Sequence, residues 1–115
     1  MAKAAKIPNP LERRHLVEKD LPADQARAIA DAYLAEDRSL EAIDFLKIAG
    51  AGEGLAELRA RALSDGDAFL LRAVAAAQAK PPTREDWQKV AAAAAASGRD
   101  RYAVEARRQA ERSDG

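Results

Sequence analysis

Few residues in this chain could do metal or redox chemistry, because it has one histidine, His15, and no cysteine. Glu12 stands three residues before His15, the spacing that supplies half of a di-iron site in helical bundles. A complete site needs two such pairs, and one histidine can form only one of them. We therefore predict no metal site and no cofactor. The absence of cysteine excludes a disulfide framework, a thiol nucleophile and a zinc finger.

A glycine-rich segment, Gly50-x-Gly-x-Gly54, has the composition of a phosphate-binding loop but not its context. A phosphate loop follows a strand and carries a lysine and a hydroxyl residue, whereas this segment follows an expected helix and has neither. We predict a hinge between helical hairpins here.

Serine nucleophiles are not expected either. Each of the four serines falls at an expected helix end or turn, where the hydroxyl group caps the backbone, and the only histidine is far away in the sequence. These residues are Ser39, Ser64, Ser97 and Ser113. We predict no catalytic residue and no enzyme.

The elements that position these residues are expected to be helices. Alanine supplies 30 of the 115 residues, and strong helix formers dominate the rest. Turn and cap residues divide the chain into about six to seven short helices over the approximate ranges 10–19, 22–35, 39–49, 55–63, 68–79, 84–96 and 99–112. We predict an all-α fold in which short turns make neighbouring helices antiparallel. The inward faces are expected to include Leu11, Phe69 and Tyr102.

The predicted organisation is a flexible basic arm over 1–8, one all-α domain over 9–112, and a frayed end over 113–115. The N-terminal segment has no apolar stretch typical of a secretion signal, so the chain is expected to be cytoplasmic. Arginine outnumbers lysine by 13 to 6. Together with the alanine content, this excess is typical of a GC-rich, bacterial coding sequence.

Two segments share a pattern of small and large residues. The first is Ile29-Ala30-x-x-Tyr33-Leu34, followed by Ala42-x-x-x-Leu46-x-x-Ala49, and the second is Trp87-x-x-Val90-Ala91-x-x-Ala94, followed by Gly98 and Ala103. The pattern resembles the tetratricopeptide (TPR) repeat, best over residues 26–49 and 84–106. The second copy departs at Ala94, where an aromatic residue is usual, and at Arg107, where a large apolar one is usual. The copies are 61 residues apart rather than 68.

The resemblance implies hairpins stacked as a TPR-like α-α superhelix, and a compact helical bundle is the alternative. It also implies that the first helices of the hairpins line a groove that binds a peptide or a partner helix. The partner-binding positions would be Arg27, Asp31, Leu34, Gln88, Ala92 and Ala95. The predicted function is therefore a non-enzymatic protein–protein interaction module or scaffold.

Two other functions are kept as alternatives. The first is self-association into a homodimer, because exposed alanine surface at the ends of a short repeat array needs cover. The second is nucleic-acid binding through the C-terminal arginines, which are Arg99, Arg101, Arg107, Arg108 and Arg112. The net charge is zero, but residues 28–58 carry −5 (seven acids, two bases) and the remainder +5. No membrane partner is expected, because no apolar stretch is long enough to span a bilayer.

Overall fold

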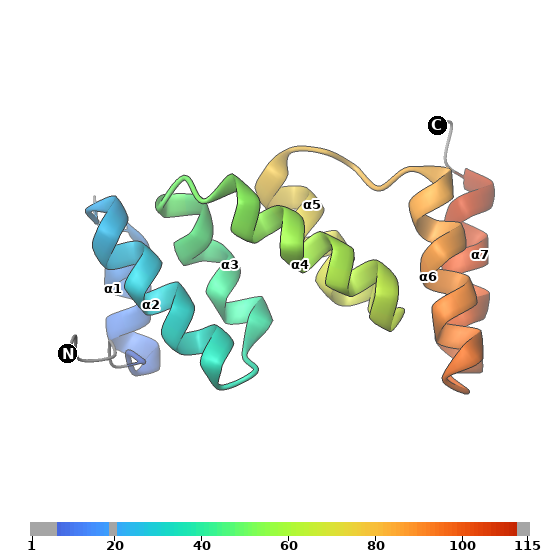
Figure 1. The fold of residues 1–115 in the computed structure, drawn as a ribbon, viewed down its shortest axis with the longest axis horizontal. Coiled ribbons are helices and arrows are strands. Elements are labelled where there is room, and N and C mark those ends of the chain that lie inside the picture. The colour runs from blue at the N-terminus through green and yellow to red at the C-terminus, as the bar shows by residue number, and fades with distance from the viewer. Residues whose placement is uncertain (1–6, 19–20, 113–115) are drawn as a thin grey trace. The chain divides into compact units, whose positions relative to one another are not determined.

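The computed structural model describes residues 7–18 and 21–112, and all regular structure within these ranges is helical (Figure 1). The prediction of an all-α chain is confirmed. The seven described helices are α1 (Pro10–Glu18), α2 (Ala23–Ala35), α3 (Ser39–Ile48), α4 (Gly52–Asp65), α5 (Ala68–Gln78), α6 (Arg84–Ala96) and α7 (Asp100–Arg112).

The chain divides into two compact units, unit 1 over Met1–Leu55 and unit 2 over Ala56–Gly115. The boundary lies within α4, one turn after its start. A single domain over 9–112 stays a prediction. Most of the predicted arm over 1–8, and all of the predicted frayed end over 113–115, lie outside the described residues.

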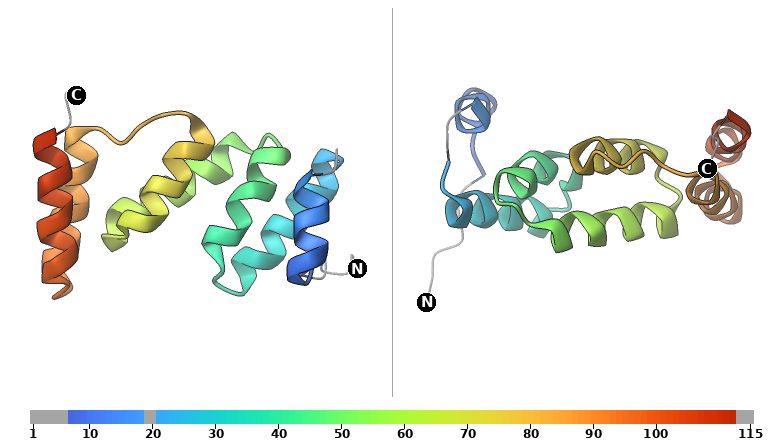
Figure 2. Two further views of the ribbon diagram at one scale, coloured as in Figure 1. Left: turned by 180° about the vertical axis from the view of Figure 1, so that it is seen from behind. Right: turned by 90° about the horizontal axis from the view of Figure 1, so that it is seen from above.

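Unit 1 is built on the hairpin of α2 and α3, which lie side by side in Figures 1 and 2. Ala30 on α2 and Ala42 on α3 are fully buried, and their small side chains let the two helices approach closely. Tyr33 and Phe45 stack between the helices with their ring centroids 5.7 Å apart. The prediction that Leu11 points inward is wrong: this side chain on α1 is 68% exposed.

Only the first two residues of the predicted hinge over 50–54 lie outside the helices. Gly50 adopts the left-handed conformation, with φ at +65°, just after α3, but α4 already begins at Gly52. Gly54 is therefore helical, and its role is close packing. A Cβ atom on Gly54 would lie 3.0 Å from Leu46 Cδ2 and 3.1 Å from Arg27 Nη1.

Unit 2 contains most of α4, α5 and the antiparallel pair α6–α7. Its core combines large side chains on α4, α5 and α6 with alanines on α7. The fully or almost fully buried residues include Leu58, Leu71, Val74, Trp87, Val90, Ala103, Ala106 and Ala110. Because α7 buries only alanine, it can lie close to α6.

The turn between α4 and α5 is packed directly on α6. Gly66 in this turn has φ at +70°, and a Cβ atom there would lie 2.6 Å from the backbone nitrogen of Ala94. No side chain fits at that distance, so the turn needs glycine for both its conformation and its contact. Asp67 follows and caps α5 by accepting a hydrogen bond from Leu70 N–H at 3.0 Å. This turn fixes the start of α5 against α6.

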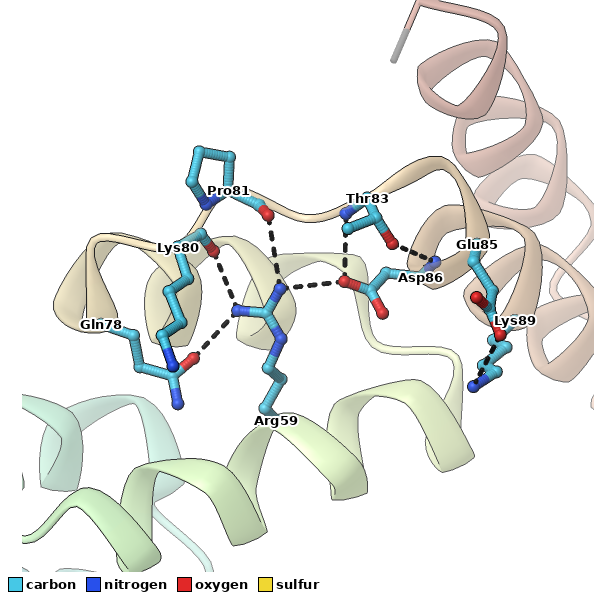
Figure 3. A network of polar contacts seen from close by, with 8 residues as sticks. All are labelled: Arg59, Gln78, Lys80, Pro81, Thr83, Glu85, Asp86 and Lys89. Carbon is cyan, nitrogen blue, oxygen red and sulfur yellow. Dashed lines mark hydrogen bonds and ion pairs between the residues drawn. The ribbon is translucent and has the colours of Figure 1, made fainter. Parts of the chain in front are cut away.

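The connection from α5 to α6 is held by Arg59 of α4 (Figure 3). Its guanidinium group donates to the backbone oxygens of Lys80 (2.9 Å) and Pro81 (3.4 Å), and to Asp86 Oδ2 (2.9 Å). It also donates to Gln78 Oε1 at 2.9 Å. One side chain therefore binds the end of α5, the connection and the first turn of α6.

The start of α6 is capped by its own side chains. Thr83 Oγ1 accepts a hydrogen bond from Asp86 N–H at 3.1 Å, and Asp86 Oδ2 accepts one from Thr83 N–H at 3.0 Å, which is a capping box. Partial burial opposes ionisation of Asp86, but the hydrogen bond from Thr83 and the ion pair with Arg59 outweigh it. The pKa of Asp86 therefore lies below its ordinary value.

In the part of the chain that the structure describes, no helix is both long enough and apolar enough to cross a bilayer.

Candidate functional site

Unit 2 exposes a pair of aromatic side chains, Phe69 on α5 and Tyr102 on α7. Phe69 is 63% exposed and Tyr102 is 46% exposed, and their ring centroids lie 6.4 Å apart in an edge-to-face arrangement with an interplanar angle of 79°. Edge-to-face contact is a favoured geometry for two aromatic rings. The pair is therefore a defined apolar feature on the surface of this unit.

The expectation that both aromatic residues point inward is wrong. At 100° per residue, the buried positions 68, 70, 71, 74 and 75 of α5 centre on the side opposite Phe69. Because α5 is apolar on almost every side, its sequence does not show whether the side with Phe69 or the side with Leu71 faces the core. In the structure it is the side with Leu71. On α7 the buried arc is narrow and is filled by alanine, so Tyr102 lies beside it.

A cavity of about 370 Å³ adjoins the aromatic pair and is lined by Gly66, Asp67, Ala68, Phe69, Arg99 and Tyr102. Two turns, one before α5 and one before α7, position these residues. Asp67 is fixed by its cap on α5, and Arg99 Nη1 donates to the backbone oxygen of Asp65 at 3.4 Å. We call Asp67, Phe69, Arg99 and Tyr102 the aromatic surface.

Chemically, the aromatic surface suits binding. It combines two exposed rings with a guanidinium group and a carboxylate, and a second cavity of about 450 Å³ shares Asp67 and Arg99 with it. Tyrosine and arginine are enriched among the residues that dominate binding energy at protein interfaces. Among the described residues, tyrosine aside, no polar or charged residue is buried, and no group of three His, Cys, Asp or Glu side chains could hold a metal ion.

The partner-binding residues predicted in unit 1 lie on α2. Arg27 and Asp31 are exposed and form an ion pair across one helical turn, with Nε and Oδ1 3.1 Å apart. Leu34 is half-buried. The Arg27 side chain also lies against Gly54 at the start of α4, so it is held on two sides.

The residues predicted in unit 2 lie on α6, and all three are exposed: Gln88, Ala92 and Ala95. Gln88 lines a cavity of about 430 Å³ together with Arg84, Arg107, Ala110 and Glu111. Arg84 Nε donates to the backbone oxygen of Ala110 at 3.1 Å, which ties the start of α6 to the end of α7. The two predicted triplets belong to different units, and their joint use in one groove stays a prediction.

The C-terminal arginines are interrupted by an acid. Arg101, Arg108 and Arg112 lie on one face of α7 at helical spacing, and all are exposed. Glu105 lies among them, 3.6 Å from Arg108 and 3.7 Å from Arg72 of α5. A hydrogen bond from Gln109, followed by the neighbouring guanidinium groups, lowers the pKa of Glu105, so its negative charge persists in this stripe. That charge opposes binding of a polyanion.

Comparison with known protein families, with curated proteins and with solved structures finds no match to this chain.

Proposed function

We propose that this chain is a non-enzymatic protein–protein interaction module of helical-repeat type. Its partner is a peptide or helix that places an apolar side chain on the aromatic surface of unit 2. The single observation that carries the proposal is the exposed edge-to-face pair of Phe69 and Tyr102 beside a cavity.

Energetics favour covering this pair. Burying a phenylalanine side chain fully contributes about 1.5–3 kcal/mol, and Phe69 leaves well over half of its surface exposed. A ring already held against a neighbouring ring loses little conformational entropy when a partner covers it. Arg99 and Asp67 flank the rings with opposite charges and supply polar contacts at the rim.

The TPR-like resemblance supports the same class of function. Tyr33, Ala42 and Leu46 of the first motif are fully buried, as are Val90 and Ala94 of the second. In that interpretation the partner also contacts the first helices of the hairpins. The contact residues are then Arg27, Asp31, Leu34, Gln88, Ala92 and Ala95.

A random peptide display library selected on the whole chain tests the proposal. We expect selected peptides to carry aromatic or large aliphatic residues and to lose about tenfold in affinity on Phe69→Ser or Tyr102→Ser. Val104→Ser is the matched control, because Val104 is an apolar residue of α7 with 51% exposure that does not line the aromatic cavity. Peptides that keep full affinity for both aromatic variants would contradict the proposal.

The same aromatic pair also favours a second candidate function, self-association. A partner copy that covers Phe69 would produce a dimer at micromolar concentration in sedimentation velocity, and Phe69→Ser would return it to the monomer. A monomer at all concentrations eliminates this candidate. Nucleic-acid binding through α7 is eliminated if no salt-sensitive gel shift occurs near about 100 mM salt.

A further inference from the structure

The aromatic surface carries opposite charges on its two helices. On one side, Asp67 precedes α5 and Phe69 follows two residues later. On the other side, Arg99 precedes α7 and Tyr102 follows three residues later. Both charged residues line the same cavity as the two rings. The surface is therefore apolar, with an acidic group on the α5 side and a basic group on the α7 side.

Neither charge is neutralised by another described residue. Asp67 is half-buried and Arg99 is exposed, so water reaches both side chains. Asp67 Oδ1 accepts a hydrogen bond from Leu70 N–H, and Arg99 Nη1 donates to the backbone oxygen of Asp65. Neither side chain forms an ion pair within the described part of the chain, although both line the same two cavities. Each charge therefore lacks a counter-ion there.

The neighbouring charges, by contrast, are paired. One turn further along the same two helices, Arg72 of α5 and Glu105 of α7 pair with each other at 3.7 Å. Asp65, which lines the second cavity, pairs with Arg61 of α4 at 3.7 Å. The aromatic surface is therefore left with one unpaired negative charge and one unpaired positive charge.

A second copy of this chain carries the complement of this pattern. In a two-fold symmetric contact both copies use the same patch, so the α5 side of one copy can face the α7 side of the other. A two-fold axis between the two sides brings Asp67 of each copy to Arg99 of the other. It also lays Phe69 of each copy against Tyr102 of the other. Two ion pairs then form, and all four rings are covered.

The two kinds of contact contribute differently. An apolar centre with a polar rim is the usual organisation of a protein interface, and here the rings form the centre. Ion pairs at an exposed rim add little affinity, but oppositely charged groups fix the orientation of the partners, and like charges oppose wrong ones. Asp67 and Arg99 therefore select the two-fold arrangement, while the rings supply most of the affinity.

We propose that two copies of this chain associate through the aromatic surface about a two-fold axis, with reciprocal Asp67–Arg99 ion pairs around the rings. The contact rests on self-association, the second candidate function of this surface. Because the peptide of the first candidate function covers the same rings, dimerisation and peptide binding exclude each other.

Sedimentation velocity of the whole chain at several concentrations tests the contact. We expect a reversible dimer in the micromolar range. Arg99→Glu and Asp67→Arg each replace two attractive pairs by two repulsive ones, so each should weaken the dimer about tenfold or more. An equimolar mixture of the two variants restores both pairs in a heterodimer and should recover the natural affinity to within about threefold.

Lys89→Glu is the matched control. It makes the same change of charge at an exposed residue of α6 that lines neither cavity, so the dimer should be unchanged. Asp67→Arg also removes the cap of α5, and circular dichroism checks that this variant is folded. If it is not, Asp67→Asn takes its place, because asparagine is an equally good cap without the charge. Its mixture with Arg99→Glu should still associate more than either variant alone.

Four results would overturn the proposal. A monomer at every concentration excludes the dimer but leaves peptide binding unaffected. A dimer that persists in both charge variants keeps self-association and removes the reciprocal ion pairs. A mixture of folded variants that associates no more than each variant alone excludes the two-fold geometry. A selected peptide that binds without dissociating the dimer places the two contacts on different surfaces.

Discussion

Unit 1 buries both of its aromatic side chains, whereas unit 2 buries one and exposes two. In unit 1, Tyr33 and Phe45 are fully buried and stacked between α2 and α3. In unit 2, Trp87 on α6 is buried, but Phe69 and Tyr102 lie at the surface and meet edge to face. The comparison shows that residue type alone does not decide whether an aromatic side chain is buried.

The reason lies in the helix that covers each core. In unit 1, α3 buries Ile43, Phe45 and Leu46 as well as Ala42, so its buried face includes large side chains, and the Phe45 ring packs against Tyr33. In unit 2, α7 buries only alanines and lies close to α6. Its one tyrosine is therefore left at the surface.

The strongest test of this comparison exchanges each tyrosine for alanine. Tyr33→Ala leaves a large cavity in the core of unit 1, and we expect it to lower the free energy of unfolding by about 3–5 kcal/mol. Tyr102→Ala should change that free energy by less than about 0.5 kcal/mol. Urea unfolding followed by circular dichroism measures both. Similar losses in the two variants would show that Tyr102 has a structural role.

Gly66→Ala tests the turn that positions the aromatic surface. The new Cβ atom would clash with the backbone of α6, and the left-handed conformation adds strain, so we expect a loss of about 2 kcal/mol or more. Gly98→Ala is the matched control. Gly98 also has positive φ, at +75°, but nothing lies within 4 Å of its Cβ position, so only the conformational cost of about 1–2 kcal/mol remains. Fluorescence of Trp87 during urea unfolding reports on unit 2, and equal losses in the two variants would contradict the close contact.

Asp86→Asn should cost about 1–2 kcal/mol at neutral pH, because it weakens the hydrogen bond to Arg59 in a site where both side chains are less than one-fifth exposed. The folded pKa of Asp86 is lowered, so its contribution is complete above the unfolded pKa. The contribution is lost as the pH falls through the lower, folded value.

Urea unfolding of the natural chain and Asp86→Asn at neutral pH and near pH 3 measures this effect. The difference in the free energy of unfolding between the two chains should be smaller near pH 3 than at neutral pH. Glu85→Gln is the control, since Glu85 is exposed and pairs only across one turn with Lys89, with 3.5 Å between Oε1 and Nζ. A difference in unfolding free energy that stays constant with pH would contradict the lowered pKa of Asp86.

The smallest effects on stability are expected at the predicted groove positions. Asp31→Arg and Ala92→Glu both change exposed residues and should alter the free energy of unfolding by less than about 0.5 kcal/mol. The two variants are instead tested by measuring their affinity for peptides selected on the natural chain. A tenfold loss with either variant and none with Phe69→Ser would favour the predicted partner-binding residues over the aromatic pair.

Local signals in the sequence predicted the helices well. Caps and turns depend on residues that are close together in the sequence, so the sequence alone indicates them. Examples are Thr83 with Asp86, Gly50, and the turn at 64–67. The aromatic surface could not be predicted, because the exposure of Phe69 and Tyr102 depends on what the neighbouring helices bury.

Long-range polar contacts could not be predicted from the sequence either. Arg59 stands in an ordinary amphipathic pattern, and nothing around it indicates that its partners lie about 20 to 27 residues further on. The distinction between Gly66 and Gly98 has the same cause. Both end a helix with positive φ, but only Gly66 meets a distant backbone.

The contacts of Arg59 bear on where the chain can be engineered. Residues 79–83 contain two prolines, whose nitrogens cannot donate hydrogen bonds, so Arg59 holds this segment through its carbonyl groups. An inserted tag or a circular permutation between Lys80 and Thr83 would separate those carbonyl groups from Asp86 and release the start of α6. The turn at Gly98 has open space around its Cβ position, but it is followed by Arg99 of the aromatic surface, so an insertion there would disturb that surface instead.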